Sequence, residues 1–202
     1  MYVTDDLIRK MENEFGHPLE SAFSIPCTTE ELDRIRSSQK HGRNHDVTLY
    51  IRKQDKLVVI AKHPYPPGLF RAPSGGLEPG ESFLDGIRRE MTEEIGCEIR
   101  LVRFLLRISV HFFCDAKREE ETSARHKPAA DTIFWRSFVF LADYVRGDFA
   151  FTDHDEIREV RLADWSKFSA FAAIMRGTDS GGLHYRAQLH ERVVETMKRF
   201  HL

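Results

Sequence analysis

The chain has 202 residues, of which 41% are hydrophobic and 31% charged, a mixture typical of a globular domain and unlike that of a disordered chain. Its 30 basic and 32 acidic residues give a formal charge of −2, which disfavours a nucleic-acid-binding protein. No run approaches the roughly 18 apolar residues of a membrane span, and the polar N-terminus does not resemble a signal or transit peptide. Three cysteines without Cys-x-x-Cys spacing (Cys27, Cys97 and Cys114) predict reduced, buried thiols and a cytoplasmic protein.

The first 45 residues are polar and predict two helices. The first helix has apolar residues at helical spacing between Leu7 and Phe15. The second begins near Thr28, where a hydroxyl cap precedes acidic residues. Residues 37–44 predict a linker. We therefore interpret residues 1–45 as an N-terminal helical extension.

Strand patterns follow this extension. Two β-rich runs, at 47–52 and 57–61, are separated by a short turn and predict a hairpin. A Pro/Gly-rich loop covers residues 63–68. Between 82 and 95 the apolar residues recur at three- and four-residue steps, which predicts an amphipathic helix that ends at Gly96.

The second half of the chain continues the alternation of strands and helices. Strands are predicted at 99–104, 106–114, 132–145 and 156–162, and helices at 164–175 and 183–200. Because strands lie on both sides of one central helix, the pattern predicts a mixed sheet. Four strand phenylalanines are expected in the core: Phe112, Phe113, Phe138 and Phe140. The apolar stripe of the last helix either packs on the same chain, which we favour, or forms a homodimer interface.

The helix at 82–95 carries a cluster of carboxylates. Glu90, Glu93 and Glu94 share one face, because they are spaced by three and four residues. Such spacing is typical of a solvated helix face, but converging carboxylates are also the ligands that Mg²⁺ prefers. The glycine-rich loop before the helix could add a backbone carbonyl to a metal, and its N–H groups could meet phosphate oxygens. Glu81 lies at the helix entrance, where a bend would let it pair with Arg89 and orient Glu90.

The 23 residues from Gly75 to Cys97 resemble the Nudix box, G-x5-E-x7-R-E-U-x-E-E-x-G-U, in which U is a bulky aliphatic residue. Eight of the nine defined positions match, and Cys97 at the final U position is the one departure. The resemblance implies a Nudix-type α/β/α sandwich with a mixed sheet over residues 46–165. Residues 166–202 would then form C-terminal helices packed on this core.

The resemblance also implies a chemistry: a MutT-like pyrophosphatase that uses Mg²⁺ or Mn²⁺ to hydrolyse the pyrophosphate bond of a nucleoside diphosphate linked to another moiety X. X could make the substrate a nucleotide sugar, an ADP-ribose-like compound or a nucleoside triphosphate. The implied metal ligands are Glu90, Glu93, Glu94 and the Gly75 carbonyl. The implied catalytic residues are Glu90 and Glu93, with Arg89 and Glu81 orienting the helix face. We expect a small-molecule partner, and neither a nucleic-acid polymer nor a membrane.

Several candidates lie outside the box. The general base could be Glu90 itself, one of the glutamates at 119–121, Glu156 or Glu159. Arg71 and His63 flank the loop before the box and could contact phosphates. Aromatic residues that could stack on a nucleobase are Tyr65, Phe70 and Trp135, although such residues more often belong to the core.

Two other functions remain open at this point. The first is a catalytically idle Nudix-fold module that senses a nucleotide, although the intact pairs Arg89–Glu90 and Glu93–Glu94 favour catalysis. The second is an isopentenyl diphosphate isomerase-like enzyme, which typically needs a reactive cysteine. Neither Cys97, at the end of the box, nor Cys114, on a predicted strand, suits that role.

Overall fold

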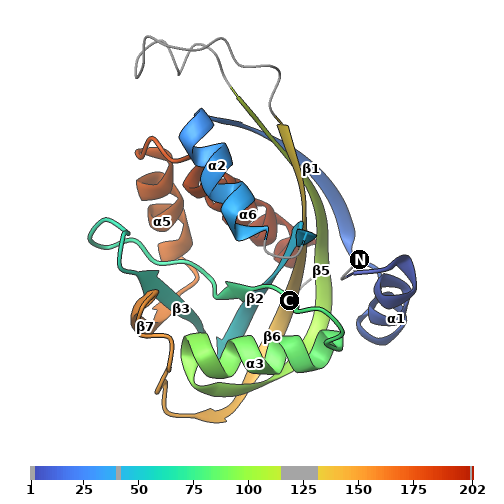
Figure 1. The fold of residues 1–202 in the computed structure, drawn as a ribbon. Helices are drawn as coiled ribbons and strands as arrows, with labels where there is room; N and C mark the ends of the chain where they lie inside the picture. The colour runs from blue at the N-terminus through green and yellow to red at the C-terminus, as the bar shows by residue number, and fades with distance from the viewer. Residues whose placement is uncertain (1–2, 40–41, 115–131, 201) are drawn as a thin grey trace.

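A seven-stranded mixed sheet forms the centre of the computed structural model, which describes residues 3–39, 42–114, 132–200 and 202 (Figure 1). The strand order is β1-β5-β6-β2-β3-β7, and the short β4 pairs with β2. β1 runs parallel to β5 and β2 parallel to β6, whereas the other pairs are antiparallel. The strands are β1 (Leu19–Cys27), β2 (His45–Lys53), β3 (Lys56–Lys62), β4 (Ser74–Gly75), β5 (Cys97–Cys114), β6 (Thr132–Gly147) and β7 (Ile157–Asp164).

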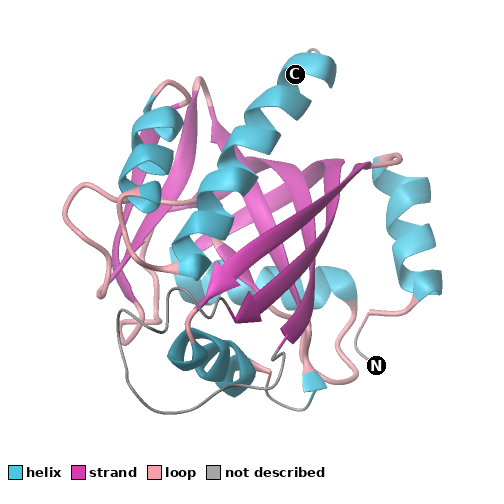
Figure 2. Ribbon diagram, turned by 90° about the horizontal axis from the view of Figure 1, so that it is seen from above, coloured by secondary structure: helices cyan, strands magenta, loops and turns pink. Residues whose placement is uncertain are grey.

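Helices cover both faces of this sheet. They are α1 (Asp5–Phe15), α2 (Thr29–Ser38), α3 (Phe83–Ile95), α5 (Lys167–Arg176) and α6 (Gly181–Phe200). Figure 1 shows α2, α5 and α6 together on one side and α3 on the other, and Figure 2 shows the long α6 crossing the sheet. Two apolar clusters match these layers, one shared with α2, α5 and α6 and one with α1 and α3. The predicted fold class, an α/β/α sandwich with a mixed sheet, is confirmed.

The central strand β2 shows why the sheet needs cover on both faces. Val47, Leu49 and Ile51 belong to the cluster under α3, while Tyr50 belongs to the cluster under α6. Successive side chains of a strand point to opposite faces, so this continuous apolar run buries both faces. Phe112, Phe138 and Phe140 are likewise buried, as expected. The same expectation is wrong for Phe113, which is only half-buried.

The N-terminal segment contains a strand that the sequence patterns do not predict. α1 and α2 are confirmed, with side-chain caps from Thr4 and Thr28. Between them, however, β1 adds to the edge of the sheet beside β5. Leu19, Phe23, Ile25 and Cys27 lie on the core face of β1 at two-residue spacing, but Ser21 interrupts this alternation and Pro26 argues against a strand. The boundaries of the three predicted segments, 1–45, 46–165 and 166–202, stay a prediction.

The predicted break in the following strand is also wrong. β5 is continuous from Cys97 to Cys114 and accommodates the irregularity by register shifts against β6, between Leu101 and Arg103 and between Phe104 and Leu106. Such bulges let a strand bend without ending. At the other end of the chain, the apolar stripe of α6 is buried in the shared core, so this helix packs on its own chain. No described helix is both long and apolar enough to cross a membrane.

His190 of α6 is an ionisable residue that is buried inside this core. It is 1% exposed and lies against the rings of Tyr50 and Phe168, with centroid distances of 6.0 and 4.9 Å. Neither of its ring nitrogens has a hydrogen-bond partner. Burial, aided by the charges of Arg186 and Arg71, lowers the pKa of His190 from 6.5 to about 3. The imidazole is therefore neutral throughout the physiological range.

This burial predicts acid sensitivity. The unfolded chain protonates His190 below pH 6.5, whereas the folded protein resists protonation down to about pH 3. The stabilisation is therefore complete above pH 6.5 and is lost as the pH falls, by up to about 1.4 kcal/mol per pH unit. We expect His190→Leu to flatten the fall in the free energy of unfolding between pH 6.5 and 4, measured by urea denaturation. His17→Leu is the control, since His17 is 81% exposed; identical slopes in all three proteins would contradict the prediction.

Candidate active site

Helix α3 has sharply defined ends that fix the position of its carboxylates. The Ser82 hydroxyl caps the first turn by accepting from Asp85 N at 3.2 Å. The helix ends at Gly96, whose φ of 62° is left-handed and whose Cβ position is occupied by the backbone of Ala150. Only glycine meets both conditions without strain.

Arg89 is anchored at one end by Glu81, as the sequence predicts. Arg89 Nε donates to Glu81 Oε1 at 2.9 Å and Nη2 donates to Glu81 Oε2 at 3.1 Å. Nη2 also donates to the Gly76 carbonyl at 2.9 Å. The hydrogen bond from Arg89 lowers the pKa of Glu81, so the pair is charged at neutral pH. This two-pronged contact is the arrangement that orients a guanidinium most firmly.

The other side of the same guanidinium contacts the helix carboxylates. Arg89 Nη1 donates to Glu90 Oε1 at 3.0 Å and to Glu93 Oε2 at 3.1 Å. Glu93 is half-exposed, with 46% of its side chain accessible, whereas Glu90 is largely covered. Arg89 therefore holds the Glu90 and Glu93 carboxylates of α3 in a fixed position relative to the loop that carries Glu81.

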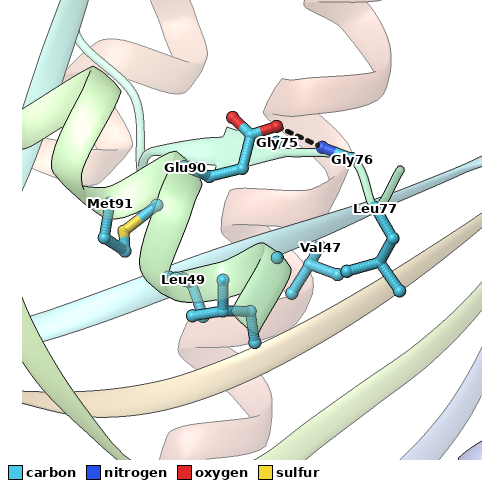
Figure 3. Close-up of a pocket in the computed structure, with 9 residues that line it drawn as sticks. Val47, Leu49, Gly75, Gly76, Leu77, Glu90 and Met91 are labelled. Carbon is cyan, nitrogen blue, oxygen red and sulfur yellow. Dashed lines mark hydrogen bonds between the residues drawn. The ribbon is translucent and has the colours of Figure 1, made fainter. Parts of the chain in front are cut away.

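Glu90 lies directly on the backbone of the glycine-rich loop. Its Oε1 accepts from Gly76 N at 3.1 Å (Figure 3). A Cβ at Gly75 would overlap the Glu90 carboxyl carbon, so the close approach depends on glycine at this position. Burial, together with the charge of Glu93, raises the pKa of Glu90 against the opposing effect of Arg89. The pocket beneath is only about 10 Å³, which is too small for a substrate.

Glu94 is the most deeply buried of the three carboxylates. It is 4% exposed, and its Oε2 accepts from Ser74 N at 3.0 Å. Its Oε1 lies 3.7 Å from Arg71 Nη2 and 3.8 Å from Lys62 Nζ. Burial nevertheless outweighs these two cations and raises the pKa of Glu94. The alternative of a solvated helix face is therefore wrong for this residue.

The strand register shows which backbone groups of β4 face the carboxylates. Leu49 N donates to the Pro73 carbonyl at 3.0 Å, and Gly75 lies opposite Val47. Bonded and non-bonded residues alternate along an antiparallel ladder, so the polar groups of Gly75 turn toward β2. Those of Ser74 turn away from β2, as its N–H to Glu94 shows.

These residues fit a hard divalent cation, although the described part of the chain holds no ready-made cage of three His, Cys, Asp or Glu side chains. Glu90 accepts a hydrogen bond from Gly76 N, and Glu94 accepts one from Ser74 N. Both carboxylates therefore lie at the same loop, on either side of Gly75. The pKa values of both are raised by burial, and the charge of Glu90 adds to the effect on Glu94. Buried oxygen ligands that repel one another are a suitable donor set for Mg²⁺ or Mn²⁺.

The three predicted phosphate or base contacts lie in different surroundings. Phe70 is 3% exposed and packs against Phe171, so its ring is not available for stacking. Arg71 is buried and points to Glu94, not to an open loop. His63 is exposed, and its Nε2 lies 3.1 Å from the His154 carbonyl. Phe70 and Arg71 are therefore engaged inside the protein, whereas the exposed His63 stays a predicted phosphate contact.

Among the candidates for a general base, Glu156 is the one that the loop after β6 connects to α3. Thr152 N and Asp153 N both donate to the Glu93 carbonyl, at 2.9 and 3.0 Å, and so tie this loop to α3. Glu156, at its end, pairs with Lys62, which also faces Glu94. Burial opposes the charged form of Glu156, but Lys62 outweighs it and lowers the pKa.

The remaining candidates are less closely connected. Glu159 is exposed on β7 and lies 3.9 Å from Arg161. The glutamates at 119–121 lie outside the described residues. Cys97 is buried and burial raises the pKa of its thiol, which disfavours the isomerase-like chemistry that needs a reactive cysteine.

Two basic residues of the site are not identified by the sequence patterns. Lys62 ends β3 and bridges Glu94 and Glu156, a role that only the tertiary structure creates. Arg186, on α6, donates to Ser74 Oγ at 3.0 Å across 112 positions of sequence. A lysine at a strand end and an arginine on a helix are usually exposed, so neither carries a local signal.

The buried pair of Arg71 and Glu94 predicts a large coupling. Replacing Arg71 by methionine leaves the Glu94 charge buried with only Lys62 nearby, and we expect a loss of about 3–5 kcal/mol in the free energy of unfolding. In a Glu94→Gln background the same replacement costs at least about 1 kcal/mol less, because no charge is stranded. Urea denaturation of the four proteins measures this cycle, and an equal loss in both backgrounds would show that the pair is not coupled.

Comparison with known proteins identifies the family of the chain. The NUDIX domain model matches residues 41–181, well over half of the chain. A NUDIX hydrolase structure from Nitrosomonas europaea is 19% identical, with 78% of this chain and 89% of that chain covered (TM-score 0.49). A UDP-X diphosphatase is 17% identical over 94% and 78% (TM-score 0.47), and an ADP-ribose pyrophosphatase from Streptococcus suis 89-1591 is 17% identical over 61% and 75% (TM-score 0.40). The family match confirms the resemblance seen at Gly75–Cys97: the chain belongs to the Nudix hydrolase family.

Proposed function

We propose that this protein hydrolyses the pyrophosphate bond of a nucleoside diphosphate linked to a second moiety. The observation that carries the proposal is the attachment of Glu90 and Glu94 to the backbone on either side of Gly75. Two carboxylates held at one loop, one buried and one largely covered, suit a substrate whose phosphates arrive with a divalent cation. A module that only sensed nucleotides would not need this costly arrangement of charges.

The metal-binding residues in this proposal are Glu90 and Glu94, with Glu93 as a further ligand or helper. Of the two backbone carbonyls at β4, that of Ser74 supports ligation better than that of Gly75, because the polar groups of Ser74 face the carboxylates. A bound Mg²⁺ or Mn²⁺ would neutralise phosphate oxygens and make water a stronger nucleophile. Arg89, fixed by Glu81, keeps Glu90 and Glu93 in place during this chemistry.

Glu156 is our candidate for the general base. Lys62, which also faces Glu94, holds the Glu156 carboxylate beside the site, and the lowered pKa keeps Glu156 ionised at neutral pH while making it a weaker base. The loop that carries it is tied to α3 through the Glu93 carbonyl. In the proposed reaction Glu156 takes a proton from the attacking water, and the phosphate on the far side of the broken bond leaves.

Glu94→Gln provides the first test. The amide keeps an oxygen for Ser74 N but lacks the charge, so we expect an unchanged fold and a kcat lower by at least about two orders of magnitude. Nucleoside diphosphate derivatives and damaged nucleoside triphosphates are incubated with Mg²⁺ or Mn²⁺, and phosphate release is measured. The control is Glu98→Gln, which removes an exposed glutamate just beyond the box.

The outcomes of this assay separate the two main functions. Turnover by the parent protein and by Glu98→Gln, but not by Glu94→Gln, supports the hydrolase. Equal activity of Glu94→Gln and the parent would remove Glu94 from the proposed site. Nucleotide binding without turnover of any compound would instead support the sensing module.

A second test addresses the base. We expect Glu156→Gln to reduce kcat by about 10²–10⁴-fold, the usual contribution of a general base, while Mn²⁺ affinity measured by calorimetry stays unchanged. Glu159→Gln serves as the matched control, because Glu159 is an exposed glutamate three residues along the same segment. If both variants retain full activity, the proton goes elsewhere. If Glu156→Gln also loses Mn²⁺, Glu156 acts as a ligand.

Two further points belong to the proposal. The three cysteines, Cys27, Cys97 and Cys114, lack Cys-x-x-Cys spacing and suit a reducing compartment, so we propose a cytoplasmic location. We keep a homodimer as a proposal for the assembly in solution, which sedimentation would measure.

A further inference from the structure

A second cavity lies on the sheet face opposite α3. It has a volume of about 150 Å³ and is lined by residues of α2, α6 and the sheet. Its lining residues are Ile35, Ser38, Asp46, Phe112, Trp135, Gly182, Tyr185 and Arg186. At roughly 30 Å³ per water it holds about five water molecules. Such a cavity takes one flat ring system and not a whole nucleotide, which needs a larger pocket.

The apolar part of the lining is aromatic. Phe112 and Tyr185 are buried, and their rings meet edge to face with centroids 5.9 Å apart. Trp135, on β6, is only half-buried and so has ring surface to offer. Aromatic faces of this kind bind nucleobases by stacking.

The polar part of the lining is a buried ion pair, Asp46 and Arg186, in which some hydrogen-bonding groups have no partner. Asp46 is 6% exposed, and its Oδ2 accepts from Arg186 Nη2 at 2.7 Å. Its other oxygen, Oδ1, is buried and has no hydrogen-bond partner. Arg186 also donates to Thr48 and Ser74, which uses three of its five N–H groups. A buried carboxylate oxygen without a donor is costly unless a ligand supplies one.

The cavity is next to the proposed catalytic site. Asp46 precedes Val47, which lies opposite Gly75 in the ladder, so the strand that carries Asp46 lies about 5 Å from the box loop. Ser74 connects the two sites directly: its Oγ accepts from Arg186 at 3.0 Å and its N donates to Glu94 at 3.0 Å. One nucleotide is therefore long enough to place its base in the cavity and its phosphates at the carboxylates.

We propose that this cavity binds the nucleobase of the substrate and selects guanine or uracil. Both bases carry a ring N–H beside a carbonyl oxygen. The N–H would donate to Asp46 Oδ1, and the carbonyl would accept from a remaining Arg186 N–H, while Trp135 stacks on the ring. Adenine has no carbonyl, and cytosine has no ring N–H at its pairing edge. This inference rests on the proposed hydrolysis of a nucleotide-type substrate.

Binding of free nucleoside monophosphates tests the cavity without catalysis. A Trp165→Phe protein keeps Trp135 as its single tryptophan, since the chain has two. Its fluorescence is titrated with UMP, GMP, AMP and CMP in the presence of EDTA. We expect UMP or GMP to bind at least about tenfold more tightly than AMP and CMP, and Asp46→Asn to abolish that preference.

Matched variants separate recognition from damage to the fold. Asp143→Asn removes another arginine-paired aspartate on the sheet, away from the cavity, and keeps the preference. Gly182→Leu fills the cavity without touching the ion pair, because a Cβ at Gly182 meets only Ser180 Oγ, at 3.7 Å. We expect it to abolish binding, whereas Gly182→Ala leaves binding intact. If Asp46→Asn does not fold, this second pair decides the question.

Each outcome bears on one proposal at a time. Equal affinity for all four monophosphates, or an unchanged preference in Gly182→Leu, overturns the base cavity. Hydrolysis of diphosphate derivatives without discrimination between bases also overturns it and leaves the proposed function standing. A preference for UMP or GMP without hydrolysis of any derivative supports the cavity and removes the proposed function.

Discussion

The hydrogen bond from Ser74 N to the buried carboxylate of Glu94 is the contact on which the site depends. It fixes α3 to β4, and β4 is in turn paired with the central strand β2. The hydroxyl of the same serine accepts from Arg71 and Arg186, which arrive from the loop before the box and from α6. Ser74 thus connects helices on both faces of the sheet, and a displacement of α3 or α6 would change the position of the carboxylates.

The site combines carboxylates whose ionisation is favoured by a neighbouring cation with carboxylates whose ionisation is disfavoured by burial. Glu81 is ionised by Arg89, and Glu156 by Lys62, whereas burial makes ionisation of Glu90 and Glu94 unfavourable. In the folded protein the charged forms of Glu90 and Glu94 are therefore disfavoured, whereas the neighbouring Glu81 and Glu156 are charged and paired with cations. Such an arrangement is stable only because the rest of the sandwich is well packed, and it agrees with the proposal that the pair binds a cation.

Features set by local sequence could be predicted, and those set by distant contacts could not. The bounds of α3 and the pairing of Glu81 with Arg89 follow from caps, glycines and helical spacing within one segment. β1 is hard to find although its apolar residues alternate, because its partner β5 is more than eighty residues away and Pro26 argues against a strand. The sequence leaves Phe70 open between the core and a stacking role, and only the packing of α5 against its ring shows that it belongs to the core. Arg186 reaches Ser74 only through the packing of α6.

The position of β1 has a consequence for any shortened form of the protein. The family match begins at residue 41, after β1 and α2. A chain trimmed to that boundary would lose the parallel neighbour of β5 and uncover a ladder of N–H and C=O groups along Leu106–Cys114. Bare strand edges pair readily with other chains, so the N-terminal segment protects the sheet against aggregation as well as extending it.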